Sequence, residues 1–397
     1  MATSTLAEGN VMAVSVMMIH DIRLGPSENR GNFRDLAEEC AHRRNESRRM
    51  VRLIVETPMR ILIAYDGSEH ADAALDDLAL AGLPPDAEAL VLSVLDAWLP
   101  EESAPGGKAD EALPALHEIR GAVNARLEAQ RGIAREGAAK LAALFPNWRV
   151  SADTCVDTPV GAIIRRAEGG EGGVGVWGGK PADLVVVGSR GHGLVKRALL
   201  GSVARQVMHG LRCSLRICRG PRRSLKPDTP AVADASPPGP PRVLVGTDGS
   251  SDSRAAVEAV SNRRWPIGTH ILIATYGQGI AGLEHSLAAG MTGFAVWGGD
   301  SPEQAAPSDS RLSRIAAEAF GVVRGRCPGV SVSTVVRLAN PRYALIDEAA
   351  NWKPDGADCI FVGARGVRGF DRLLLGSVSS GVAMEAPCSV EIVHPRR

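Results

Sequence analysis

A glycine pattern that could bind a phosphate group occurs twice in the chain. Residues 188–191 read Gly-Ser-Arg-Gly and are followed, after nine residues, by Gly201 and Ser202. The same spacing, Gly-x2-Gly-x9-Gly-Ser, returns at residues 363–377. Glycines let backbone N–H groups approach phosphate oxygens, and a following helix N-terminus adds a favourable dipole. The pattern therefore predicts an anion site in each copy, with the serine hydroxyl as a further donor. The alternative is a turn and helix start that binds nothing.

An aspartate follows an apolar run at the matching place in each copy. Asp66 comes after residues 60–65 and Asp248 after residues 242–247, and both continue as Asp-Gly-Ser. A carboxylate there can accept a hydrogen bond from a ribose hydroxyl or hold a metal ion bound to phosphates. An Asx turn or a helix cap is the alternative role. Because each aspartate is expected beside a glycine loop, we interpret both as binding residues.

The elements that must position these residues follow one order in both copies. Each Asp-Gly-Ser ends a continuous apolar run, which is typical of a strand buried on both faces. Helices alternate with the strands, and Pro159 and Pro341 suit the first turn of a helix. Further strands are predicted at 89–94, 149–155, 183–187 and 214–218, and at 270–274, 331–338, 358–362 and 389–393. This alternation predicts an α/β fold with two doubly wound, mainly parallel five-stranded sheets, which bind ligands at the carboxyl ends of their strands.

The repeat also divides the chain. Residues 1–57 show no clear period and are expected to be a poorly ordered N-terminal extension. The two copies form domains at 58–219 and 241–397. Residues 220–240 contain six prolines and almost no apolar periodicity, which predicts a semi-rigid linker between the domains.

Composition excludes several classes of protein. Lys plus Arg and Asp plus Glu each total 45, so the chain lacks the basic excess of a nucleic-acid-binding protein, and aromatic residues make up only 4%. Its seven cysteines form no C-x-x-C pair, which favours buried thiols in a reducing compartment. No apolar run reaches the roughly 18–20 residues of a membrane-spanning helix. We therefore expect a cytoplasmic protein with no nucleic-acid or membrane partner.

Both copies resemble universal stress protein domains of the nucleotide-binding kind, joined in tandem. The resemblance is carried by Asp-Gly-Ser, the glycine pattern, Leu-Leu-Gly-Ser-Val at 199–203 and 374–378, and Ala-Pro-Cys at 386–388. It implies a Rossmann-like strand order of 3-2-1-4-5 in each sheet. It also implies that the final strands of the two domains meet as an intrachain pseudo-dimer, which would cover an otherwise free edge. Whether two chains associate further as a homodimer is left open.

The resemblance implies ATP as the ligand, with or without Mg. In that family the glycine loop cradles the phosphates, the aspartate lies near the ribose, and a residue at the end of the second strand contacts adenine. The arginine within each loop could attract phosphate, although a solvated basic face is the commoner explanation. The residues carried over are Asp66, Gly67, Val94, Gly188, Arg190, Gly191, Gly201, Ser202 and Val203 in the first copy, and Asp248, Gly249, Thr275, Gly363, Arg365, Gly366, Gly376, Ser377 and Val378 in the second.

The predicted function is a nucleotide-dependent regulatory module in stress adaptation rather than an enzyme. The sequence shows no Walker lysine after the glycines and no paired general acid and base near them. Slow ATP hydrolysis is the most catalysis we expect. Two alternatives stay open at this stage: a nucleotide-free structural or protein-interaction pseudo-dimer, and a slow ATP-hydrolysing enzyme.

Overall fold

The computed structural model describes residues 58–97, 113–169, 177–191, 200–220, 239–277, 307–367 and 375–395. The predicted N-terminal extension (1–57) and nearly all of the predicted linker (220–240) lie outside these residues. Within the described part, no helix combines the length and the apolar character needed to cross a membrane.

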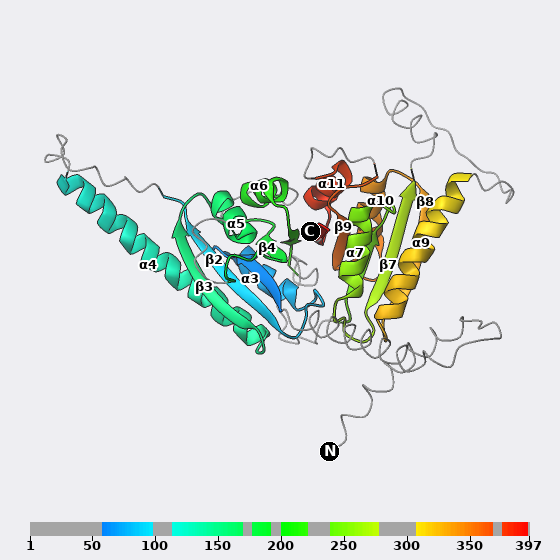
Figure 1. The fold of residues 1–397 in the computed structure, drawn as a ribbon, viewed down its shortest axis with the longest axis horizontal. Helices are drawn as coiled ribbons and strands as arrows, with labels where there is room; N and C mark the ends of the chain where they lie inside the picture. Colours follow the sequence, from blue (N-terminus) through cyan, green and yellow to red (C-terminus); the bar gives the residue numbers. More distant parts are fainter. Residues whose placement is uncertain are drawn as a thin grey trace, which may run out of the picture. The chain divides into compact units, whose positions relative to one another are not determined.

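Strands and helices alternate in both halves, as the repeat predicts (Figure 1). The first half consists of β1 (Met59–Ala64), α3 (Glu69–Leu78), β2 (Ala87–Leu95), α4 (Leu113–Leu144), β3 (Arg149–Val156), α5 (Pro159–Glu168), β4 (Leu184–Gly188), α6 (Ser202–Gly210) and β5 (Ser214–Cys218). The second half consists of β6 (Arg242–Gly246), α7 (Ser251–Ser261), β7 (His270–Gly277), α9 (Pro307–Arg326), β8 (Ser331–Leu338), α10 (Pro341–Asn351), β9 (Cys359–Gly363), α11 (Ser377–Glu385) and β10 (Ser389–Val393).

The strands form one continuous ten-stranded sheet in the order β3-β2-β1-β4-β5-β10-β9-β6-β7-β8. Each half therefore has the predicted order 3-2-1-4-5, and all strand pairs within a half are parallel. The two predicted five-stranded sheets join through β5 and β10, which pair antiparallel. The predicted meeting of the final strands is thus confirmed within a single chain.

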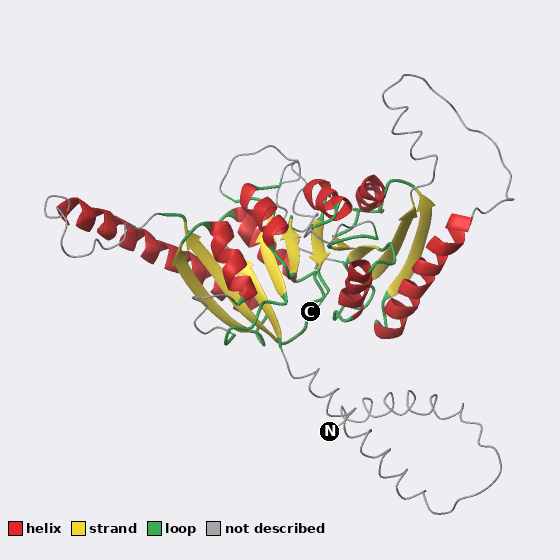
Figure 2. Ribbon diagram, turned by 45° about the horizontal axis from the view of Figure 1, so that its top comes forward, coloured by secondary structure: helices red, strands yellow, loops and turns green. Residues whose placement is uncertain are grey.

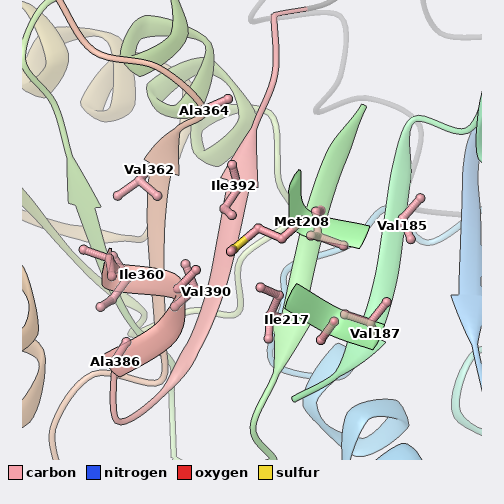
Figure 3. Close-up of a cluster of buried hydrophobic side chains, with 14 of the residues drawn as sticks. Val185, Val187, Met208, Ile217, Ile360, Val362, Ala364, Ala386, Val390 and Ile392 are labelled. Atoms are coloured by element: carbon pink, nitrogen blue, oxygen red, sulfur yellow. The ribbon is translucent and has the colours of Figure 1, made fainter. Parts of the chain in front are cut away.

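Helices cover both faces of this sheet (Figure 2). On one face, α5, α6, α10 and α11 pack on a single apolar cluster that runs through both halves. Figure 3 shows this cluster at the junction, where Ile217 of β5 lies close to Val390 of β10. On the other face, α3 and α4 cover one cluster and α7 and α9 cover a second, separate one. Because the sheet is covered on both sides, the inner strands β1, β4, β6 and β9 are largely apolar without alternation, as the sequence indicates for β1 and β6.

In each half, one Asp-Gly-Ser turn leads from the first strand into the first helix. Gly67 and Gly249 both have φ of 77°, a left-handed conformation that favours glycine. The serine that follows each glycine caps the helix, since Ser68 Oγ accepts from Ala71 N and Ser250 Oγ accepts from Ser253 N, both at 3.2 Å. The motif therefore turns the chain from strand to helix and leaves the aspartate at the carboxyl edge of the sheet.

Candidate functional site

A cavity of about 490 Å³ lies at the carboxyl ends of β1 and β4 in the first half. This volume is within the range of small-molecule sites, about 300–1,000 Å³. The lining residues are Ala64, Tyr65, Asp66, Ala71, Leu92, Val94, Pro159, Ile163, Val187, Gly188, Arg190, Gly191, Leu200, Gly201, Ser202, Val203 and Ala204. Eight of the nine residues predicted for the first site are among them. The ninth, Gly67, shapes the turn below Asp66, and a β carbon on it would face Ile133 of α4 at 3.0 Å.

The glycine pattern and the aspartate come together in this cavity. A β carbon added to Gly191 would stand 2.6 Å from Asp66 Oδ2, so no side chain fits there without displacing the carboxylate. The two ends of the pattern are also joined, because Gly201 N donates to Ser189 O at 2.8 Å. Asp66 Oδ1 accepts hydrogen bonds from Ser68 N at 3.0 Å and Ser68 Oγ at 2.6 Å, which fixes the carboxylate.

The first turn of α6 faces the same cavity. Gly201 occupies the N-cap position, where no described side chain bonds to the free amides of the helix, and Ser202, Val203 and Ala204 line the cavity. These amides are unsatisfied by the helix itself and carry its positive end. An anionic group fits this end of the cavity.

Arg190 brings a cationic side chain to the same place. Its Nε is buried and, within the described residues, has no hydrogen-bond partner. A buried guanidinium nitrogen without a partner is costly, and an anion in the cavity would supply the missing acceptor. The remaining lining is mostly apolar, formed by Leu92, Val94, Pro159 and Ile163 among others. The sequence analysis missed this apolar lining, although Leu92 could have been found two residues before Val94 on the same strand face.

Tyr65 is a further residue that the sequence analysis did not single out. Its hydroxyl donates to Asp72 Oδ1 at 2.5 Å and accepts from Lys140 Nζ at 3.2 Å. Burial and the bond to Asp72 raise the pKa of Tyr65 to about 12. The phenol therefore stays protonated at neutral pH, and its ring packs in the cluster that α3 and α4 cover.

The second half brings together the equivalent loop residues. A β carbon on Gly366 would stand 2.7 Å from Asp248 Oδ2, and Gly376 N donates to Ala364 O at 2.7 Å. Ser377 and Val378 begin α11 directly after that bond. Gly249 again forms the turn, and Gly363 lies so close to α7 that a β carbon on it would meet Asp252 backbone at 2.4 Å. The geometry at the two ends of the loop is thus repeated.

The partner of the loop arginine separates the second crevice from the first. Arg365 donates from Nε and from its backbone N to Asp252 Oδ2, at 3.0 and 3.1 Å, so its guanidinium is already paired with a buried carboxylate. The first half has His70 at the equivalent position, four residues after Asp66. Asp248 Oδ2 accepts a hydrogen bond from Val367 N at 2.9 Å, which fixes this carboxylate in the loop. Burial alone would raise the pKa of Asp248, but hydrogen bonds from Ser250, Val367 and Ser253 outweigh it and lower that pKa.

The placement of Thr275 with the other site residues is wrong by one position. Ala64 pairs with Leu92, and the equivalent Gly246 pairs with Ala274, so Tyr276 and not Thr275 corresponds to Val94. Successive side chains of a strand point to opposite faces. Thr275 therefore points to the face covered by α9, as Ser93 points to α4, where it bonds to Gln130. Tyr276 lies on the crevice face, where it is 6% exposed and donates to Glu348 Oε2 at 3.3 Å.

The fold and this crevice define a tandem doubly wound α/β protein whose glycine loops meet an aspartate at the carboxyl edge of the sheet. The model of the universal stress protein family matches residues 58–219 and 293–394, which together exceed half of the chain. The chain therefore belongs to the universal stress protein family.

Individual relatives agree with this membership. A universal stress protein of Mycolicibacterium smegmatis is 31% identical over 222 residues, which cover 55% of this chain and 63% of that protein. One from Mycobacterium tuberculosis is 28% identical over 213 residues, covering 54% of this chain and 62% of the relative. The chain thus spans somewhat over three fifths of the length of these curated relatives.

Solved structures of the family are also similar. A universal stress protein from Archaeoglobus fulgidus is 20% identical with a TM-score of 0.45, covering 84% of this chain and 98% of that one. A universal stress protein solved in complex with cAMP is 26% identical with a TM-score of 0.26, covering 39% of this chain and 97% of its own.

Proposed function

We propose that the cavity of the first half binds ATP, with or without Mg, and that the chain acts as a nucleotide-dependent regulatory module in stress adaptation. The observation that carries this proposal is the contact between Asp66 and Gly191 inside a cavity of about 490 Å³. A carboxylate and a loop of bare backbone, one beside the other, offer an acceptor for a ribose hydroxyl and donors for phosphate oxygens.

The distribution of polar and apolar groups supports an orientation for the nucleotide. Phosphates would bind at the first turn of α6, where free amides and Ser202 offer donors and Arg190 Nε has no acceptor among the described residues. The ribose would then lie at Asp66. The adenine would lie between Val94, Leu92 and Ile163, whose apolar side chains suit the faces of a base.

The second crevice is proposed to bind nucleotide far more weakly. Tyr276 introduces a phenol ring where the first half has only Val94, and it packs in the same buried cluster as Leu345. Arg365 is held by Asp252, so moving it to a phosphate would leave a carboxylate buried without its cation. One nucleotide per chain is therefore expected.

Binding rather than catalysis suits the titratable groups around the first cavity. Among its lining residues these are Tyr65, Asp66 and Arg190. Tyr65 stays protonated and is bonded to Asp72 and Lys140, so it offers no base. In-line attack on a phosphate needs a positioned water or base. Hydrolysis is expected to be slow.

The direct test is calorimetric titration of the full-length chain with ATP and Mg, with ADP, GTP and cAMP as comparison ligands. The expected result is a stoichiometry near one with preference for an adenine nucleotide, and an upward shift in melting temperature. A chain that shows neither heat nor thermal shift with any of the four would overturn the proposal and favour a structural pseudo-dimer. Turnover above about 1 per second would instead identify an enzyme.

A further inference from the structure

The junction between the halves contains a buried pair of opposite charges on its central strands. In the antiparallel pairing of β5 with β10, Arg216 lies directly opposite Glu391. Arg216 Nη1 donates to Glu391 Oε2 at 3.2 Å, and both side chains are about 1% exposed. Buried ion pairs are rare and need further polar partners to offset the loss of water.

These partners come from both halves. Arg216 Nη2 lies 2.8 Å from Asp77 Oδ2 on α3, and Arg263 after α7 forms an ion pair with Glu391. Ser389 Oγ of β10 donates to Asp77 Oδ1 at 2.7 Å, across the junction. Positive and negative groups thus alternate along a buried row of four: Asp77, Arg216, Glu391, Arg263.

Arg216 and Glu391 occupy equivalent positions of the repeat. In the first half Gly188 pairs with Cys218, and in the second half Gly363 pairs with Val393. Arg216 lies two residues before Cys218, and Glu391 lies two residues before Val393. The first domain therefore presents a cation, and the second an anion, at the equivalent position of its final strand.

The row lies on only one face of the junction. On the opposite face, Leu215 and Ile217 join Val390 and Ile392 in one apolar cluster that crosses from half to half (Figure 3). Apolar contacts of this kind bring two such strands together but discriminate weakly between partners. On the charged face the apolar clusters of the two halves are separate, and the polar row lies where they would otherwise meet.

We propose that Arg216 and Glu391 select the partner of each half, so that a first half pairs with a second half and not with another copy of itself. Pairing β5 with β5 would place Arg216 opposite Arg216, and pairing β10 with β10 would place Glu391 opposite Glu391. Asp77 and Arg263 would remain with their own halves, but like charges would face each other without water, and the cross-strand bond would be lost. Like charges directly opposite each other destabilise a strand pair, and repulsion in the wrong complex gives specificity.

Other hydrogen bonds that only the pairing of a first with a second half can form support the same conclusion. Ser389 Oγ accepts from Arg219 N at 2.9 Å and donates to Asp77, and both partners belong to the first half. Arg219 also donates to the carbonyl of Cys388 at 3.1 Å and to that of Ala383 at 2.6 Å. A pairing of two identical halves would leave these groups facing the wrong partners. Of these interactions, only the Arg216–Glu391 pair also produces a repulsion between like charges when two identical halves pair.

The experiment starts from the full-length chain carrying a protease site within residues 221–238. The folded protein is cut there, unfolded in urea and refolded, and native mass spectrometry then counts the three pairings of the halves. Wild type is compared with Arg216→Gln/Glu391→Gln, which keeps polar groups at both positions but removes the complementary charges. Arg342→Gln/Glu385→Gln is the matched control, because that ion pair lies wholly within the second half.

Wild type and control are expected to form mixed pairs, with pairs of identical halves at least about tenfold rarer than random association gives, which corresponds to ~1.4 kcal/mol of discrimination. In the double variant, pairs of identical halves should rise about tenfold, toward the random proportion. Random pairing in wild type, or exclusive mixed pairing in the double variant, would overturn the proposal.

Urea unfolding of the uncut protein gives a second measurement that does not need refolded halves. Each single variant, Arg216→Gln or Glu391→Gln, leaves one charge buried beside a neutral partner, whereas the double variant removes both. The two substitutions should therefore be strongly non-additive in their effect on the unfolding midpoint. Additive effects would show that the two residues do not act as a pair and would refute their role.

Discussion

Asp66 Oδ2 lies 2.6 Å from the point where a β carbon on Gly191 would stand. The same relationship holds between Asp248 and Gly366, at 2.7 Å. An aspartate just after the first strand of each half thus disfavours any side chain larger than hydrogen at the second glycine of the loop after the fourth strand. The contact explains why an aspartate and a glycine so far apart in the chain occur at matching places in both copies.

Gly191→Ala is expected to weaken nucleotide binding by at least about tenfold, since the new methyl group must displace the Asp66 carboxylate or the loop. The measurement is calorimetric titration with ATP and Mg. Gly366→Ala is the matched control, because it makes the same change in the crevice that we expect not to bind. Equal affinity in wild type and Gly191→Ala, or a larger loss in Gly366→Ala, would contradict the assignment of the site to the first half.

Exchange of Val94 and Tyr276 should exchange the properties of the two crevices. Val94→Tyr places a phenol ring against the apolar end of the first cavity and is expected to abolish binding of one nucleotide per chain. Tyr276→Val removes the ring from the second crevice, and a weak second binding event should then appear in the titration. If Val94→Tyr binds as wild type does, the adenine does not lie beside β2.

The two loop arginines should respond differently to the same substitution. Arg190→Gln is expected to reduce ATP affinity by about tenfold with little effect on stability, because its Nε has no partner among the described residues. Arg365→Gln should instead lower the free energy of unfolding by about 1–3 kcal/mol, because Asp252, which is 2% exposed, loses its charged partner. Titration and urea unfolding of both variants provide the comparison. An affinity loss confined to Arg365→Gln would reverse the assignment.

The free energy of unfolding should depend on the ionisation of Asp248 at acid pH. Its pKa in the folded protein is below the ordinary value of 3.8, so the ionised carboxylate stabilises the folded state. That contribution is complete above about pH 4 and disappears as the pH falls through the lowered pKa. The difference in unfolding free energy between wild type and Asp248→Asn should therefore be constant near neutrality and shrink below pH 4. Asp86→Asn, at an exposed position, is the control; the same pH trend in both variants would contradict the prediction.

The sequence by itself determined the repeat and the alternation of strands and helices, and the family resemblance implied the strand order. Its motifs and that resemblance together predicted eight of the residues that line the first cavity. Asp66, Gly188 and Gly191 could be assigned because each is marked by its neighbours: an apolar run, a fixed spacing, a Gly-Ser pair. Local patterns of this kind can be recognised in a sequence because backbone turns and helix starts depend on residues close together in the chain. The apolar lining of the cavity carries no such mark, since Leu92 and Ile163 look like any other core residue.

Only the tertiary structure decided which side chains face the first cavity and which face each other. Thr275 and Tyr276 are adjacent in the sequence, yet an error of one residue moves a side chain to the other face of the sheet. The ion pair of Arg365 with Asp252, and the row formed by Asp77, Arg216, Glu391 and Arg263, join residues distant in the chain. A buried charge can be recognised as paired only when the register of the strands is known, because its partner is selected by position in space and not by spacing along the chain.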